Sequence, residues 1–395
     1  MRRLTHAEFL AMRRFDALDG LRAIAAVIVV FFHYGGPQSK FLSGWIGVHT
    51  FFVLSGFLIT TLMLREKDRT GRISLRNFYI RRIFRIVPLY YVGLLITMVA
   101  VYKSGYSWNV LMDHLPHYLG FMNEYHLAGD TPYLHTWTIG IEQKFYLVWP
   151  LALILVSLIS SKLRVPLAVV AIGLVLIRYN DTWKGMGIHY SVLLTGALLA
   201  IVLHHRRGFA LLSPLTHPVV GVVVAAGFVV LHQHIPDLTA YFGDEQPTVF
   251  LYGIGVAILL PTLLSPGPGR WILSQRPLVF IGERSYGLYL LQAAAVPVTA
   301  TLAPWIPGQT PKFAAAACVV ALFAADALHR RVETPMIDVG RRLITWFDAR
   351  ATRRGPDAAA GTGTGTGTGT DTGTDTGTGP KADPRTDPVL TGRPQ

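Results

Sequence analysis

Apolar segments long enough to cross a membrane recur along most of the chain. Ten of them, separated by short polar stretches, cover roughly residues 21–37, 45–64, 86–102, 136–160, 165–178, 188–203, 218–232, 247–264, 286–303 and 312–328. A helix needs about 20 predominantly apolar residues to cross a hydrocarbon core of roughly 30 Å. The pattern therefore predicts an all-α, polytopic membrane protein with about ten transmembrane helices, the first and fifth of which are short.

Composition agrees with this prediction. Hydrophobic residues make up 51% of the 395 residues and charged residues only 15%, with a mean hydropathy of +0.40. A soluble domain carries nearer 25% charged residues. We therefore expect the lipid bilayer to be the main environment of the chain.

The net charge of +13 could indicate a nucleic-acid partner, but the distribution of the basic residues argues against one. With the N-terminus inside and ten spans, thirty of the 36 Lys and Arg residues fall in cytoplasmic segments. Those expected outside are Lys40, Lys103, Arg178, Lys184 and Lys312. This asymmetry is the positive-inside pattern. It predicts that both termini are cytoplasmic and that no nucleic acid binds.

Three parts are expected along the chain. Residues 1–15 form a basic cytoplasmic arm, and residues 16–347 form the membrane domain. Residues 348–395 form a cytoplasmic tail that is rich in Gly, Thr and Pro from about residue 355. Such a composition buries too little apolar area to offset its conformational entropy, so we expect disorder there.

Arg22 and His33 are the first polar residues within the apolar pattern that need an explanation. They are eleven positions apart, which puts them on one helical face and roughly 16 Å apart in height. Asp16 and Asp19 can pair with Arg22 at three-residue intervals. A neutral imidazole near mid-membrane suits a general base. The alternative is a histidine bonded to a neighbouring helix, with Arg22 as an interfacial anchor.

Arg82 and Arg85, in the sequence RRIFRIVP, share one face at the start of a span. Guanidinium groups bind phosphate through two parallel hydrogen bonds, so a donor that carries phosphates could dock there from the cytoplasm. Taken alone, however, the element fits better as a positive-inside anchor or a contact to lipid headgroups.

Glu142 lies within the otherwise apolar segment LHTWTIGIEQKFYLVWP, residues 134–150. Its expected height is roughly 21 Å above the inner face, against roughly 16 Å for His33, so the two side chains could meet. The alternative is an ion pair with Lys144. Because residues two positions apart point to different helical faces, we favour a functional role for Glu142.

Two further segments are expected to be structural. Gly47, Ser55 and Gly56, in GWIGVHTFFVLSGFLIT, fit close helix packing, and Ser55 lacks a nucleophile-elbow sequence. Glu283, Arg284 and Glu333, near the cytoplasmic ends of late spans, fit ion pairs. No CxxC, HExxH or Walker-type motif occurs, so no metal site is predicted.

Four motifs in order give the chain a family resemblance. They are LDGLRAIAAVIVVFFHY, GVHTFFVLSGFLIT, RRIFRIVP and HTWTIGIEQKFYLVWP. Over about residues 15–340 the chain resembles the acyltransferase-3 family of bacterial integral-membrane O-acyltransferases. The resemblance implies a bacterial plasma membrane protein that moves an acetyl or other short acyl group from acyl-CoA to a hydroxyl. Acceptors in the family include carbohydrates, lipids, peptides and, in actinomycete members, macrolide antibiotics.

The resemblance also assigns roles to residues. The essential Arg and His of the family correspond to Arg22 and His33, its RxxR element to Arg82 and Arg85, and its Glu to Glu142. Acyl-CoA is implied as a co-substrate, with no bound cofactor. The chain departs from the family where SYGLYLL is followed by Gln292, a position at which relatives commonly carry His.

Two other functions compete with acyl transfer. A transporter could use His33 and Glu142 as a proton relay, although inverted repeats and paired broken helices are absent from the sequence. A structural membrane protein could instead recruit a partner through its tail. Release of free CoA in the presence of an acceptor separates the enzyme from both.

Overall fold

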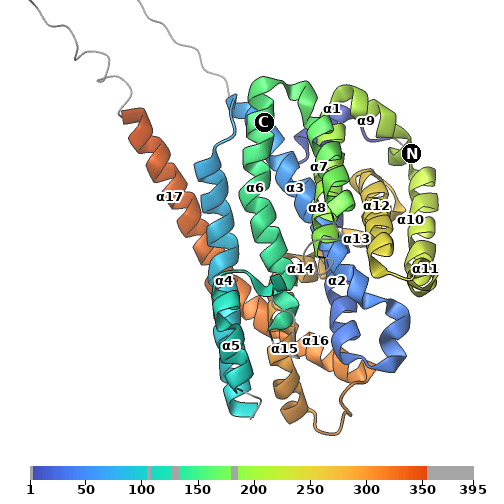
Figure 1. Cartoon of the computed structure of the whole chain (residues 1–395), viewed down its shortest axis with the longest axis vertical. Helices are drawn as coiled ribbons and strands as arrows, with labels where there is room; N and C mark the ends of the chain where they lie inside the picture. The colour runs from blue at the N-terminus through green and yellow to red at the C-terminus, as the bar shows by residue number, and fades with distance from the viewer. Residues whose placement is uncertain (1–2, 105–107, 126–132, 179–185, 354–395) are drawn as a thin grey trace, which may run out of the picture. The chain divides into compact units, whose positions relative to one another are not determined.

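The computed structural model describes residues 3–104, 108–125, 133–178 and 186–353, and all regular structure within these ranges is helical (Figure 1). The all-α prediction is therefore confirmed. Two compact units, Met1–Thr345 and Trp346–Gln395, make up the chain. The Gly/Thr-rich part of the predicted tail lies outside the described residues.

Seven helical segments in the described part of the chain are long and apolar enough to cross a membrane. They contain α2 (Asp16–Tyr34), α3 (Gly47–Thr70), α4 (Leu75–Ser104), α6 (Trp137–Ile159), α8 (Gly187–His204), α12 (Glu245–Leu264) and α16 (Pro311–Leu328). The last continues through a π-helical turn (His329–Glu333) into α17 (Thr334–Arg353). The protein is thus a multi-pass membrane protein.

The three other expected spans are also helical, but each falls short of the same criterion of length and apolarity. They are α7 (Arg164–Arg178), α10 (Pro218–Gln233) and α15 (Ser285–Leu302). Segment Arg206–Thr216 is bent by 77° from α10, and this pair would make an eighth span if counted as one. All ten segments are helices, whereas seven or eight have the dimensions of a span.

Shorter helices connect these segments. The α-helical ones are α1 (His6–Ala11), α5 (Trp108–Leu119), α9 (Arg206–Leu212), α11 (Ile235–Phe242), α13 (Pro268–Leu273) and α14 (Arg276–Glu283). The 3-10 turns are Pro37–Leu42, Gly44–Ile46, Asn123–Tyr125, Leu134–Thr136, Ser161–Leu163 and Ser213–Thr216. The stretch between the expected spans 86–102 and 136–160 is therefore partly helical where it is described.

Helices α3 and α8 lie side by side in very close contact (Figure 1). A Cβ atom at Gly56 would overlap the carbonyl group of Leu193, and one at Gly196 would overlap the carbonyl group of Val53. The small residues let the two backbones touch, as the sequence predicted for Gly56. Helix α3 carries His49 and Ser55, and α8 carries His189. The contact between the two helices therefore fixes the positions of these side chains relative to one another.

Helix α2 is held in the same way at its first turns. A Cβ atom at Gly20 would overlap the carbonyl group of Leu273, and one at Gly282 would overlap that of Asp19. Helices α13 and α14 therefore press directly on the segment that carries Arg22. Large apolar side chains of α4, α6, α7 and α10, in contrast, are exposed on the surface of the protein, which fits contact with lipid.

Candidate active site

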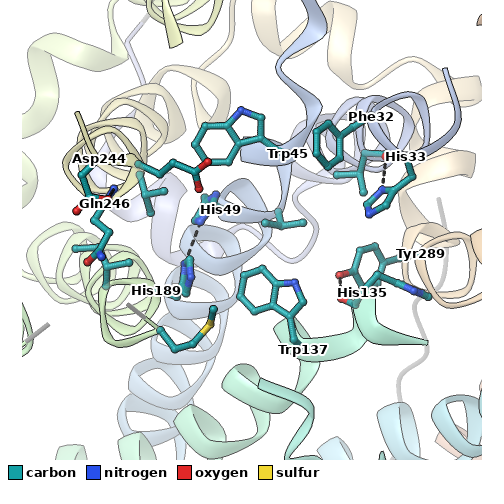
Figure 2. A pocket seen from close by; sticks show the side chains of 16 residues that line it. Phe32, His33, Trp45, His49, His135, Trp137, His189, Asp244, Gln246 and Tyr289 are labelled. Carbon is teal, nitrogen blue, oxygen red and sulfur yellow. Dashed lines mark hydrogen bonds between the residues drawn. The ribbon is translucent and has the colours of Figure 1, made fainter. Parts of the chain in front are cut away.

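The five predicted site residues divide between two pockets. Arg22, Arg82, Arg85 and Glu142 line a pocket of about 480 Å³, which we call the arginine pocket. His33 instead lines a pocket of about 400 Å³, which we call the histidine pocket (Figure 2). Both volumes lie in the range of small-molecule sites.

The arginine pocket is built where α2, α4 and α6 meet. Arg22 pairs with Asp19 at 3.3 Å, and Arg85 faces the buried carboxylate of Glu333 with 4.0 Å between Nε and Oε1. The Arg82 guanidinium lies 5.7 Å from the ring centre of Phe78 and 5.8 Å from that of Tyr146. Among the described residues, no carboxylate forms an ion pair with Arg82. Its hydrogen-bonding capacity is therefore available to an anionic ligand.

Glu142 is held by two hydroxyl groups. Ser55 Oγ donates to Glu142 Oε1 at 2.6 Å, and Tyr146 OH donates to Oε2 at 3.0 Å. The Tyr146 hydroxyl also lies 3.1 Å from Ser55 Oγ. The sequence placed Ser55 in helix packing and overlooked Tyr146, although Tyr146 follows Glu142 by four positions on one face. Each carboxylate oxygen thus has a partner in the protein.

His33 and Glu142 do not meet. His33 Nδ1 lies 2.8 Å from the backbone carbonyl oxygen of Val29. A carbonyl only accepts, so Nδ1 carries the proton of the neutral ring and Nε2 keeps its lone pair. A backbone group, not Glu142, therefore orients the imidazole. The similar expected heights gave no information on direction around the helix axes, and Glu142 faces Ser55 on α3 instead.

Four histidines line the histidine pocket, and three of them were not among the predicted site residues. His49 and His189 are both buried, with His49 Nε2 3.0 Å from His189 Nδ1. His33 and His135 lie at the other end, on either side of Tyr289 (Figure 2). The motifs HTW and GIHY at the starts of α6 and α8 were the signals available in the sequence. In the described ranges, no three His, Cys, Asp or Glu side chains are placed to hold a metal ion.

The two pockets share a wall. Val48 and Tyr289 line both of them. The Tyr289 hydroxyl is tied to the Thr138 hydroxyl at 2.9 Å and donates to the carbonyl oxygen of His135. Tyr289 is therefore fixed in place between the arginine pocket and the histidine pocket.

Several charged residues that were expected to form structural ion pairs do form them, whereas Ser55, Glu283 and Glu333 also line the arginine pocket. Lys144 pairs with Glu124 at 2.5 Å rather than with Glu142. Arg284 pairs with Asp326 at 2.6 Å, and Glu283 pairs with Arg14 at 3.2 Å.

Gln292 on α15 is 1% exposed. Within the described part of the chain, neither its amide nitrogen nor its amide oxygen has a hydrogen-bond partner. It lines neither the arginine pocket nor the histidine pocket.

A helical multi-pass chain thus keeps charged and titratable side chains in two adjoining pockets, although such groups are costly within a membrane. The chain belongs to the acyltransferase-3 family, since the family's acyltransferase domain matches residues 15–330.

Curated relatives come from Staphylococcus aureus. A protein of strain COL whose name suggests O-acetyltransferase activity is 28% identical over 367 residues, covering 85% of this chain and 59% of its own. O-acetyltransferase OatA of strain MRSA252 is 27% identical over 378 residues, covering 86% of this chain and 60% of its own. The chain thus spans about three fifths of the length of these relatives. No solved structure matches it.

Proposed function

We propose that this protein is an O-acyltransferase that moves an acetyl or other short acyl group from acyl-CoA to a hydroxyl. One observation carries the proposal. A pocket lined by Arg22, Arg82 and Arg85 shares a wall, Tyr289, with a pocket lined by His33. The arginines can bind an anionic donor on one side of Tyr289, and His33 can act as a general base on the other side. The family and the names of the relatives agree with this function.

The arginine pocket is proposed to bind the donor. Acyl-CoA carries phosphates, which guanidinium groups bind through charge-assisted hydrogen bonds. Arg13 and Arg14 of the N-terminal arm also line this pocket. Because the arm and most basic residues are expected on the cytoplasmic side, the donor would enter from the cytoplasm.

The histidine pocket is proposed to bind the acceptor. The acceptor oxygen forms a bond to the thioester carbonyl carbon while the carbon–sulfur bond breaks. His33 Nε2 takes the hydroxyl proton and passes it to the departing CoA thiolate. For this step the thioester must reach the shared wall at Val48 and Tyr289, so the rest of the donor lies in the arginine pocket.

Glu142 then has a different role from the one expected. It neither contacts His33 nor leaves an oxygen free, since Ser55 and Tyr146 occupy both oxygens. We propose that it positions the Tyr146 ring beside Arg82. It also adds a carboxylate to those of Asp19 and Glu333 in the arginine pocket.

The finer assignments belong to this proposal as well. The acceptor is a carbohydrate or a glycosylated natural product such as a macrolide, and the protein resides in the bacterial plasma membrane. Both termini are cytoplasmic. A reporter fused after Arg350 should be active in the cytoplasm, and activity on the outer face alone would contradict this orientation.

The proposed reaction is tested with purified protein in lipid nanodiscs and acetyl-CoA labelled in the acetyl group. We expect CoA release coupled to transfer of the label to an added hydroxyl compound, and loss of both in Arg22→Ala. Arg341→Ala is the matched control, because Arg341 is exposed, lines neither pocket and pairs with Asp338 at 2.9 Å. Transport of a solute without any loss of thioester would favour the transporter instead.

A further inference from the structure

The two pockets differ sharply in charge. Of the 16 residues that line the histidine pocket, none is Lys or Arg. Among the described residues that line it, the only carboxylates are Asp244, the N-cap of α12, and Glu245 in the first turn of that helix, and both are exposed. An anion that entered this pocket would lose its hydration without gaining a cationic partner. The pocket therefore disfavours carboxylate and phosphate groups, in contrast to the arginine pocket.

A backbone carbonyl group determines which ring nitrogens of His49 and His189 carry the proton. His49 Nδ1 lies 3.0 Å from the carbonyl oxygen of Ile46, so Nδ1 carries the proton of a neutral ring and Nε2 accepts. His189 Nδ1, 3.0 Å from His49 Nε2, must then donate. His189 Nε2 consequently keeps its lone pair, and among the described residues it has no partner.

Two bare ring nitrogens thus belong to opposite ends of one pocket. His33 Nε2 is fixed as an acceptor by Val29, and His189 Nε2 is fixed as an acceptor through His49. The side-chain oxygen of Gln246, which also lines this pocket, is buried without a partner in the described part of the chain. A ligand that satisfies these groups must present hydrogen-bond donors at two or more points, as a polyol does.

An aromatic ring lies between the two ends of the pocket. Figure 2 shows Trp137 between the His49–His189 pair and the group of His33, His135 and Tyr289, whereas the Trp45 ring lies beside His49, with 6.3 Å between the ring centres. The Trp137 ring centre lies 4.8 Å from that of His189. Flat aromatic faces pack well on the C–H face of a saccharide ring, whose hydroxyls then point outward to polar groups at its edge.

We propose that the histidine pocket selects a sugar ring without negative charge. The reacting hydroxyl lies on His33 Nε2, a second hydroxyl donates to His189 Nε2, and the ring packs against Trp137. This inference rests on the proposed acyltransferase function with its carbohydrate acceptor, and it adds the charge preference for the acceptor and the side chains that hold it. His189 and His49 are positioning residues, since neither touches the reacting atoms.

The charge preference is tested with methyl glucoside and two charged glycosides that each differ from it at one position. Methyl glucoside is neutral, methyl glucosaminide carries an ammonium group at C2 at neutral pH, and methyl glucuronide carries a carboxylate at C6. Acetyl-CoA consumption by protein in nanodiscs should rise with the first two and by at least about tenfold less with the third. The double variant Asp244→Asn, Glu245→Gln removes two negative charges and keeps a capping side chain at position 244. It should reduce the difference in acetyl-CoA consumption between the neutral glycoside and the glucuronide. Equal or better use of the glucuronide by the parent protein overturns the proposal.

The role of His189 is tested through the split between KM and kcat. His189→Ala should raise KM for the neutral glycoside about tenfold or more, leave KM for acetyl-CoA unchanged and change kcat little. His49→Phe should act in the same direction, because it removes the acceptor that fixes the His189 tautomer. His232→Ala is the matched control, since His232 bonds the carbonyl oxygen of Leu42 at 2.8 Å and lines neither pocket.

A deoxy probe completes the test. A monodeoxy glycoside that lacks the hydroxyl bound by His189 should lose activity with the parent protein but no further activity with His189→Ala. If every monodeoxy glycoside loses as much with the variant as with the parent, His189 does not bind a hydroxyl and the proposal fails. Slow acceptor-independent hydrolysis of acetyl-CoA, measured in the same samples, reports the acyltransferase function separately. If that hydrolysis persists while no glycoside binds or accelerates it, the sugar pocket alone is refuted.

Discussion

The arginine pocket and the histidine pocket share Val48 and Tyr289 but are built on opposite principles. In the first, charged groups face each other: Arg22 pairs with Asp19, Arg85 faces Glu333, and Arg82 is left for a ligand. In the second, neutral imidazoles are fixed by backbone carbonyl oxygens and stand among aromatic rings. One site can therefore hold an anion and the other can accept hydroxyl protons.

This difference fits the proposed function, in which the donor and the acceptor bind in separate pockets. A polyanionic donor needs cations, whereas a base that removes a hydroxyl proton works best as a neutral imidazole away from them. Because Tyr289 lies between the two pockets, the arginines of one pocket are separated from the imidazoles of the other. Variants that affect one pocket should therefore leave the other substrate's KM unchanged.

The largest expected effect is on chemistry in the histidine pocket. His33→Ala should lower turnover by on the order of 10²–10⁴ while acetyl-CoA still binds. The measurement is acyl transfer at saturating donor, normalised to folded protein. His33→Gln keeps a polar side chain and serves as the comparison. If His33→Gln turns over within about tenfold of the parent, His33 is not the base.

The next effect belongs to the donor side. Arg82→Ala should raise KM for acetyl-CoA by about 10- to 100-fold, because a charge-assisted hydrogen bond contributes roughly 1.5–3 kcal/mol. Arg85→Ala should do less, since Arg85 is about half exposed and lies near Glu333. Steady-state kinetics with acetyl-CoA varied at a fixed acceptor concentration gives both KM values. An effect of Arg85→Ala larger than that of Arg82→Ala would reverse the assignment of the free guanidinium.

A substitution between α3 and α8 should damage both pockets at once. Gly56→Ala places a methyl group on the Leu193 carbonyl, and overpacking of this kind costs typically 1–3 kcal/mol. Thermal unfolding in detergent should show lower stability, and KM should rise for both substrates. Gly227→Ala is the control, because nothing lies within 4 Å of a Cβ atom there. A change in one KM alone would show that the pockets do not depend on this helix contact together.

The smallest effect concerns the hydroxyl groups around Glu142. Tyr146→Phe removes a donor from Glu142 Oε2 but keeps the ring beside Arg82. Loss of one hydrogen bond to a charged group should raise KM for acetyl-CoA by about tenfold, with the acceptor KM unchanged. Steady-state kinetics with each substrate varied in turn measures this. A selective rise in the acceptor KM would move Glu142 to the acceptor side.

The sequence alone determined the class of protein and most of the charged site. Long apolar segments can satisfy their backbone groups in lipid only as helices, so the all-α prediction depended on composition and length. Arg22 and Glu142 stood out because polar groups within such segments are costly, and Arg82 and Arg85 stood out because their guanidinium groups share one face at the start of a span. The spacing of Lys144 from Glu142 also argued against an ion pair between them, and Lys144 pairs with Glu124 instead.

Only the tertiary structure decided which of these residues meet. Height along a helix is readable from residue number, but the neighbour on each face depends on how helices pack. His33 and Glu142 therefore came to different pockets although their expected heights agreed. His49, His135 and His189 are spread over 140 positions and converge only because Gly56 and Gly196 bring α3 against α8 and because α6 begins beside them. The tautomers of His33 and His49 likewise depend on the carbonyl oxygens of Val29 and Ile46, and a sequence pattern does not reveal such contacts.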